Sequence, residues 1–506
     1  MQGVVLNQGK MLRKIIMSLV GGMASSMCAG LAFGLNLPQP APPDISGDSL
    51  PHPRVERVAP LPSTTPVAPT PEPVISRPAA RLPPPVEVRR PLPEVGQAEA
   101  QTADDAPRAA KPRLEFGGYV QVDSRAFRFH YIELQNDAGR VSDFVDLRRA
   151  RLEAHATQKG HYDAKLSVDF GASKSRLEDG YINWQLGSDH AVKVGQFYYP
   201  FGNETQGSSK YNPFIEKSFI ANLASGGKDR GISLHGGIFD YRFYYQLAAM
   251  QGTNDNKPDS NDAVDGVARV VLRAWGEEGH SGFWLGGSYA TGKHHSLSGD
   301  EIALKAETRS GTSPDSAHPG VSYFKANIGS RVDYYVRKVG YEATAIVGPM
   351  SVQVEQYNLA YSIERPEVIA GGDVSATWII GGGQRNFREG AWHRAGIAAP
   401  VTRGGAGAWE LALRYTWANV GPAFFQTDGL YDGWQAVKDA DTAVQGEAVN
   451  AHKVQAWTWG VTWAADSYTR LMFNWVLTTT GSIGEAIKNH NKADESSYLL
   501  RLQVMF

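Results

Sequence analysis

Positively charged side chains at alternate positions suggest a surface that could bind anions. Arg149 and Arg151 share position parity with Glu153, so an extended strand would place all three on one face. Arg148 has the opposite parity, and we expect it at a strand end or at a bulge. A guanidinium group can donate two hydrogen bonds to one oxyanion, and rows of Arg and Lys select anions in pores. The other cations that we place on such a face, where they could extend an anion path, are Arg125, Lys165, Lys193, Arg269, Arg273 and Arg414.

The same cations could instead stiffen a protein wall. Charges of both signs on one face pair across neighbouring strands, and Asp123, Asp169 and Glu410 are available partners. Either role requires contact with water, because a dry core cannot hold many unpaired charges. For any single arginine of this face, wall stiffening is favoured over ion selection.

The element that would position these charges is the β-strand. Hydrophobic and polar residues alternate in 165–170, 181–186, 457–463 and 498–506. One face repeatedly carries large aromatic residues, as expected for a surface in lipid, and the opposite face carries the charges. Only a closed barrel satisfies every strand edge in lipid. We therefore predict an all-β fold, a transmembrane antiparallel β-barrel of about 16 strands over residues 113–506.

Composition argues against several other classes of protein. The 506 residues carry 50 Lys plus Arg and 52 Asp plus Glu, a net charge of −2, which disfavours a nucleic-acid partner. The single cysteine, Cys28, excludes a disulfide framework, a structural zinc cluster and an iron–sulfur site. After residue 35, no stretch approaches the length of apolar sequence that a membrane-spanning helix needs. No set of Ser, His and acidic residues has a spacing that indicates an enzyme, and we expect no cofactor and no metal.

Two segments precede the predicted barrel. Basic residues up to Lys14 stand before a short apolar run at 15–24, which small residues follow, so we predict a secretory signal peptide at 1–34. The next segment, 35–112, contains 20 of the 29 prolines, and we predict that it is a disordered periplasmic tether because it cannot bury enough apolar surface to fold. It could bind the cell wall, but a leader without a specific partner is the favoured interpretation.

Several blocks of the sequence resemble, in the same order, the phosphate-selective porins of the porin O and porin P type. They are FGGYVQVD at 116–123, DLRRARLEAH at 146–155, VGQFYYPFGNE at 194–204, SSKYNPFIEKSF at 208–219 and KDRGISLHG at 228–236. The resemblance extends from about Phe116 to Phe506. It implies a trimeric barrel whose third outer loop folds into the pore and narrows it, with arginines and lysines along an anion path.

The resemblance also assigns individual residues. The three arginines of the RRAR run at 148–151 match those that the family uses at the pore mouth. Lys210 lies in the block that resembles the constriction loop and matches its central lysine, so for Lys210 ion selection is favoured over wall stiffening. Lys217 and Arg230 are weaker candidates nearby.

We therefore expect an anion-selective diffusion channel for phosphate-type anions in the outer membrane of a Gram-negative bacterium. The expected partners are outer-membrane lipid, two further copies of the chain, small anions and the barrel assembly machinery, for which the final Phe506 resembles the usual signal. One alternative is a general porin without strong anion preference, because residues 113–506 carry 39 Lys plus Arg against 43 Asp plus Glu. Another is a structural barrel that ties the outer membrane to the cell wall through 35–112.

Overall fold

The computed structural model describes the chain from residue 112 onward, with several gaps. All of the described residues belong to one compact unit, Thr102–Phe506. The predicted signal peptide, and the predicted tether up to residue 111, lie outside the described residues. The described residues are 112–128, 144–171, 175–253, 262–297, 300–308, 322–328, 331–362, 366–421, 424, 434–436, 451–482 and 493–506.

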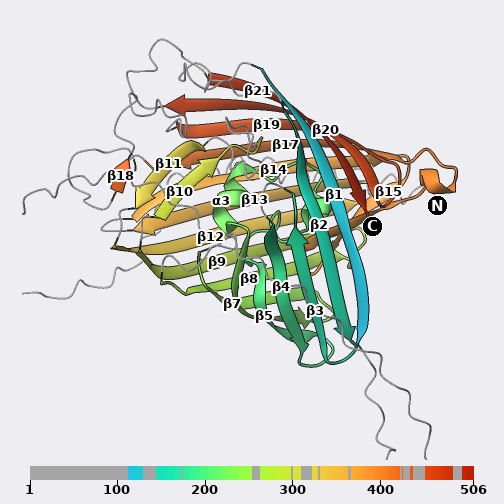
Figure 1. Cartoon of the computed structure of the whole chain (residues 1–506), viewed down its shortest axis with the longest axis horizontal. Helices are drawn as coiled ribbons and strands as arrows, with labels where there is room; N and C mark the ends of the chain where they lie inside the picture. Colours follow the sequence, from blue (N-terminus) through green and yellow to red (C-terminus); the bar gives the residue numbers. More distant parts are fainter. Residues whose placement is uncertain are drawn as a thin grey trace, which may run out of the picture. The chain divides into compact units, whose positions relative to one another are not determined.

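Sixteen strands form a closed antiparallel barrel, which confirms the predicted fold class (Figure 1). Each barrel strand pairs with the next one along the chain, and β1 pairs with β21 to close the ring. The barrel strands are β1 (Arg113–Arg128), β2 (Phe144–Gln158), β3 (Tyr162–Asp169), β4 (Arg176–Gln185), β5 (His190–Tyr198), β6 (Lys228–Ile238), β7 (Phe243–Met250), β8 (Asp265–Gly276), β9 (Gly282–Ser296), β12 (Val332–Val347), β13 (Met350–Ser362), β14 (Pro366–Ile380), β17 (Ala408–Val420), β19 (Ala451–Ala464), β20 (Thr469–Ser482) and β21 (Ala493–Met505).

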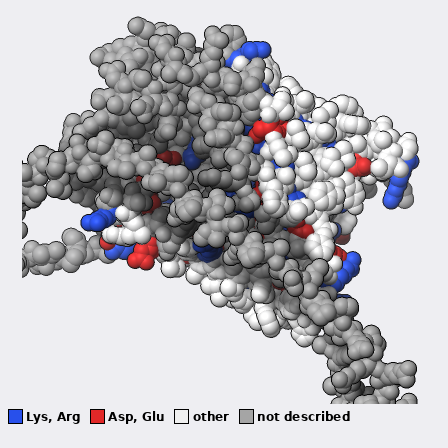
Figure 2. All heavy atoms as spheres, in the orientation of Figure 1, with Lys and Arg blue, Asp and Glu red and all other residues white. Residues whose placement is uncertain are grey.

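The outer face of the barrel is apolar and the inner face is polar, as the alternation predicts. On β17, Trp409, Leu411 and Leu413 are exposed, whereas Glu410 and Arg414 are buried inside the barrel. Most of the described surface in Figure 2 is free of Lys, Arg, Asp and Glu. In a soluble protein, apolar side chains are mostly buried and charged side chains are mostly exposed. The opposite arrangement here indicates a barrel in lipid. Among the described residues, no helix is long and apolar enough to cross a membrane.

The barrel closes where β1 meets the C-terminus. The backbone N–H groups of Gly118 and Phe506 each donate to the other residue's carbonyl oxygen at 3.0 Å. A Cβ atom on Gly118 would lie 2.2 Å from the carbonyl oxygen of Arg151 and 2.8 Å from the Phe506 ring. Glycine is therefore needed here because strand backbones approach closely.

We expect the substitution Gly118→Ala to destabilise the closed barrel by about 1–3 kcal/mol, because the clash with a backbone atom forces the seam apart. The temperature at which the folded barrel loses its heat-modifiable mobility in SDS gels measures this. The matched control is Gly396→Ala, since no atom lies within 4 Å of a Cβ built there. Equal behaviour of the two variants would contradict the prediction.

Connections fold into the barrel from both ends. We call the end with the β5–β6 connection the loop end, and the end with the short β12–β13 connection the turn end. From the loop end, residues 199–227 (the third loop) enter with η1 (Ser209–Tyr211) and α3 (Phe219–Ser225), and Figure 1 shows α3 among the barrel strands. This loop matches the inward loop that the resemblance implies. From the turn end, the β14–β17 connection adds a hairpin of β15 (Gly383–Arg388) and β16 (Ala391–Ile397), which the sequence did not predict.

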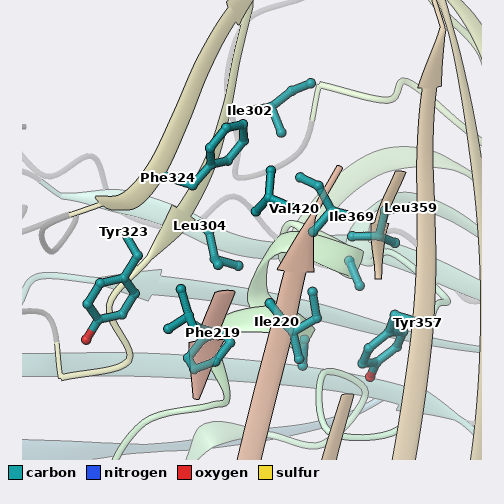
Figure 3. Packing of buried hydrophobic residues seen from close by; sticks show 14 of the residues in the cluster. Phe219, Ile220, Ile302, Leu304, Tyr323, Phe324, Tyr357, Leu359, Ile369 and Val420 are labelled. Carbon is teal, nitrogen blue, oxygen red and sulfur yellow. The ribbon is translucent and has the colours of Figure 1, made fainter. Parts of the chain in front are cut away.

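Helix α3 is held by apolar packing inside the barrel. Its N-cap is Ser218, whose side chain accepts from the N–H of Ala221, and it ends at Gly226 in the left-handed conformation. Phe219 and Ile220 belong to a buried cluster shared with the wall strands and with a small sheet (Figure 3). The strands of that sheet are β10 (Asp300–Lys305), β11 (Ser322–Ile328) and β18 (Trp434–Ala436).

Polar bonds attach the start of the third loop to the wall. The side chains of Glu204, Glu355 and Asp373 are buried, and one oxygen of each lies within 4.8 Å of the others. Glu355 accepts from the backbone N–H of Glu204 at 2.9 Å, and Asp373 accepts from the Ser218 hydroxyl at 3.1 Å. A backbone N–H group of the loop thus holds it against β13, and the Ser218 hydroxyl holds it against β14.

Candidate anion path

A cavity of about 560 Å³ lies inside the barrel at the third loop. Its described lining comes from the third loop, from β10 and from the wall strands β2, β4, β5, β6, β9, β12 and β13. Seven described lining residues are cationic and four are acidic, so the lining is net positive although the barrel sequence as a whole is net negative. The cations are Arg149, Arg151, Arg176, Lys217, Lys228, Lys305 and Lys338, and the acids are Glu178, Glu216, Asp300 and Glu301.

The RRAR arginines all point inward, and Arg148 does so through a bulge. In the β1–β2 ladder, Gln121 pairs with Arg149 and Val122 pairs with Leu147, so Arg148 is the extra residue. Of the two places that its parity allowed, a strand end or a bulge, the structure shows the bulge. The extra residue turns the Arg148 side chain inward, and its Nε donates to Glu216 Oε1 at 2.8 Å.

Glu216 on the third loop gathers the arginines of the neighbouring wall. Besides Arg148, it pairs with Arg125 at 3.2 Å, Arg149 at 3.6 Å and Arg501 at 3.1 Å. Arg125 and Arg501 also pair with the buried Asp123. Arg125 is only 1% exposed, so the structure places it under the loop and away from the cavity lining.

Further cations of β2 and β3 are also paired across strands. Arg151 donates to Asp169 at 2.8 Å and lies 2.9 Å from Glu178. Lys165 lies 3.3 Å from Glu153 and 3.0 Å from Asp179. Opposite charges thus brace the wall, as the wall-stiffening interpretation expects. Arg151 lines the cavity, and Lys165 does not.

Lys210 and Lys217 both lie on the third loop, but in different surroundings. Lys210 Nζ donates to Glu153 at 2.7 Å and does not line the cavity. Lys217 lines the cavity, and its Nζ donates only to the carbonyl oxygen of Thr205, at 3.3 Å. Within the described part of the chain, Lys217 forms no ion pair, so its charge is available to an anion.

Lys338 on β12 is a second cavity cation of this kind. Its Nζ donates to the carbonyl oxygen of Ala224 at 3.1 Å and lies 5.2 Å from the Tyr199 ring centre. It has no carboxylate partner among the described residues. The sequence alone does not single out Lys338, although this residue shares strand parity with the inward Glu342.

Burial of the Lys217 ammonium group lowers its pKa to about 8, although nearby Glu204 acts in the opposite direction. An ammonium group is charged below its pKa, so we expect anion selectivity to weaken as pH rises from about 7 to about 9. Zero-current potentials recorded across that range measure the change. In the Lys217→Arg variant the charge persists, and the pH dependence should be lost. A variant that keeps the wild-type pH dependence would contradict this assignment.

The remaining predicted cations are placed by the structure outside the cavity lining. Arg269 pairs with Glu342 at 2.7 Å, and Arg414 pairs with Glu204 at 2.6 Å. Arg273 donates to the carbonyl oxygen of Asp240 near the turn end. The other two of these cations are Lys193, which lies 4.8 Å from the Tyr181 ring centre, and Arg230, which is exposed on the outer face of β6. Roles for these residues along a longer anion path remain predictions.

The turn-end hairpin reaches the third loop. Arg385 on β15 pairs with Glu410 of the wall at 2.6 Å and donates to the carbonyl oxygen of Tyr211 in η1 at 3.1 Å. Trp392 on β16 packs against Arg385, at 5.3 Å between the guanidinium and the ring centre. The third loop is therefore braced from the turn end as well as from the wall.

Comparison with known proteins identifies relatives at the level of a family. The model of the family "Phosphate-selective porin O and P" matches residues 115–506. No curated protein gives a significant match to the sequence.

Three solved structures illustrate the structural likenesses. An anion-selective porin from Comamonas acidovorans is 11% identical with a TM-score of 0.45, and 78% of this chain aligns with 100% of it. DcaP, an outer membrane channel of Acinetobacter baumannii, is 10% identical with a TM-score of 0.46, covering 78% of this chain and 98% of that one. OmpT of Vibrio cholerae, in a trimer form, is 9% identical with a TM-score of 0.44, covering 78% and 100%. Such distant likenesses decide nothing about function.

Proposed function

Because the chain belongs to the phosphate-selective porin O and P family, we propose that it forms a water-filled, anion-selective diffusion channel for phosphate-type anions. As a member of this family it is a porin of the outer membrane rather than an enzyme. The observation that carries the proposal is the net positive lining of the cavity at the third loop.

The proposal depends on which cations retain free bonding capacity. Arg149 and Arg151 are bonded to acidic partners, so their net contribution to the local field is small. Lys217 and Lys338 lack such partners among the described residues, so they keep hydrogen-bonding capacity for a passing anion. Cationic groups of this kind replace part of the hydration shell of an oxyanion.

The test of phosphate as a substrate is a titration of inorganic phosphate into the chloride current through purified protein in planar bilayers. We expect phosphate to reduce the chloride current in a saturable manner, because it occupies the same cationic site. A chloride current that phosphate leaves unchanged would contradict phosphate binding. If the channel also lacked anion preference under a KCl gradient, the general porin would be the better description.

We propose that the channel assembles as a homotrimer in outer-membrane lipid and that Phe506 is read by the barrel assembly machinery. The final ring is 62% exposed, which leaves it accessible to a partner. Native mass measurement in detergent tests the trimer, and a single mass of one chain would contradict it. Deletion of Phe506 should reduce the amount of folded barrel in outer membranes.

We also propose that residues 35–112, after removal of a signal peptide at 1–34, form a periplasmic tether. The proline content of this segment supports the proposal. Deleting residues 38–105 should leave conductance unchanged if the segment is a spacer. Loss of envelope integrity in the same variant would favour the structural alternative, in which the segment anchors the outer membrane to the cell wall.

A further inference from the structure

The cavity at the third loop has two chemically different walls. One wall is cationic and comes mainly from β2, β4 and β6, with Arg149, Arg151 and Lys228. The other wall comes from α3 and β10 and includes the apolar side chains of Phe219, Leu223 and Ile302, beside which Asp300, Glu301 and Lys305 of β10 also line the cavity. A path for small inorganic ions alone does not need the second wall.

The apolar wall is firmly built. Phe219 of α3 and Ile302 of β10 belong to one buried cluster, which also includes Leu304 and Tyr323 (Figure 3). The rings of Phe219 and Tyr323 meet edge to face with their centres 6.2 Å apart. Packing of α3 and β10 within this cluster therefore holds the wall in place beside the cavity.

Aromatic and cationic groups also adjoin each other at the cavity. The Nζ atoms of Lys217 and Lys228 lie 5.0 Å and 4.6 Å from the centre of the Tyr198 ring, and all three residues line the cavity. Lys228 is paired with Asp179 at 2.8 Å, so Lys217 is the one of these two lysines that is available to an anion. A ligand whose anionic group bonds to Lys217 would therefore find an aromatic ring within reach of its own apolar part.

The volume of the cavity also suits an organic ligand. A volume of about 560 Å³ lies within the range of pockets that hold small organic molecules. A hydrated inorganic anion gains nothing from contact with Leu223 or Ile302, because only apolar surface is favourably removed from water there.

We propose that this cavity takes organic anions that join a carboxylate to a hydrocarbon or aromatic body, with the carboxylate on Lys217 and the body on α3 and β10. The inference rests on the proposed anion path and specifies its substrate class. Transit of such anions requires binding that is favourable enough for entry and weak enough for release.

Benzoate and acetate test the inference because they carry the same charge and differ in their apolar part. Each is titrated into the chloride current of the purified full-length protein in planar bilayers. We expect benzoate to halve the current at a concentration at least about fivefold below that of acetate, since its ring is removed from water on the apolar wall. Equal half-blocking concentrations would overturn the inference.

A substitution in α3 tests where benzoate binds. Leu223→Ser should raise the half-blocking concentration of benzoate about threefold and leave that of acetate unchanged, because only the apolar contact is removed. The matched control is Leu234→Ser, since Leu234 is exposed on the outer face of β6. If Leu234→Ser had the same effect as Leu223→Ser, the apolar wall would not be the site.

The zero-current potential in KCl separates this inference from the proposed function. Anion selectivity without discrimination between benzoate and acetate would overturn the inference alone. Absence of anion selectivity would contradict the proposed function instead.

Discussion

Replacing Glu216 by glutamine is expected to loosen the third loop and lower the stability of the barrel. The carboxylate pairs with Arg125, Arg148, Arg149 and Arg501. Arg125 and Arg501 would retain Asp123, but Arg148 and Arg149 would lose the only carboxylate that the described residues give them. Removing one side of a buried ion-pair network costs about 3–5 kcal/mol.

Unfolding by guanidinium in detergent, followed by tryptophan fluorescence, measures this loss. The matched control is Glu115→Gln, since Glu115 and its partner Arg113 are exposed, lie 2.7 Å apart and do not line the cavity. An exposed pair contributes at most about 1 kcal/mol, so the control should stay near wild type. Glu216→Gln should also increase anion selectivity, because it removes a negative charge from the cavity lining. Wild-type stability of Glu216→Gln would contradict the prediction and show that the other contacts of the loop are sufficient to hold it.

The double substitution Lys217→Gln, Lys338→Gln is expected to reduce single-channel conductance most strongly at low salt. Both lysines line the cavity without a carboxylate partner among the described residues, so they concentrate anions there. Salt screens such a field within about 10 Å at 0.1 M and about 3 Å at 1 M. We therefore expect conductance to fall severalfold near 0.1 M KCl and little near 1 M.

The control for this prediction is Lys293→Gln. Lys293 is 55% exposed and pairs with Asp333, and it does not line the cavity. Its removal should leave conductance at both salt concentrations close to wild type. An equal loss of conductance at low and high salt in the double variant would indicate a changed pore width, and it would contradict the electrostatic explanation.

The sequence predicts the wall of the barrel well because strand geometry alone determines it. Successive side chains point to opposite faces, so parity places Leu411 outside and Arg414 inside without knowledge of any contact. The same rule limited Arg148 to a strand end or a bulge, and the structure shows the bulge, because an inward arginine of the wrong parity within a strand requires an extra residue.

The lining of the cavity is less predictable, because it depends on contacts between residues far apart in the chain. Glu216 meets Arg501, and Arg385 meets the carbonyl oxygen of Tyr211, only after the third loop and the turn-end hairpin have folded inward. Lys210 and Lys217 lie in one sequence block, and nothing in that block shows that Glu153 pairs with the first of them. The partners of a lumen charge, and not its presence, decide whether it is available to an ion.

The most direct test of the account is the zero-current potential of the purified wild-type protein in a planar bilayer under a KCl gradient. The net positive cavity predicts a potential whose sign shows preferred passage of chloride. The same measurement on Lys217→Gln should give a smaller potential, and on Lys293→Gln an unchanged one. A wild-type potential near zero, or one whose sign shows preferred passage of potassium, would contradict an anion-selective channel and favour a general porin.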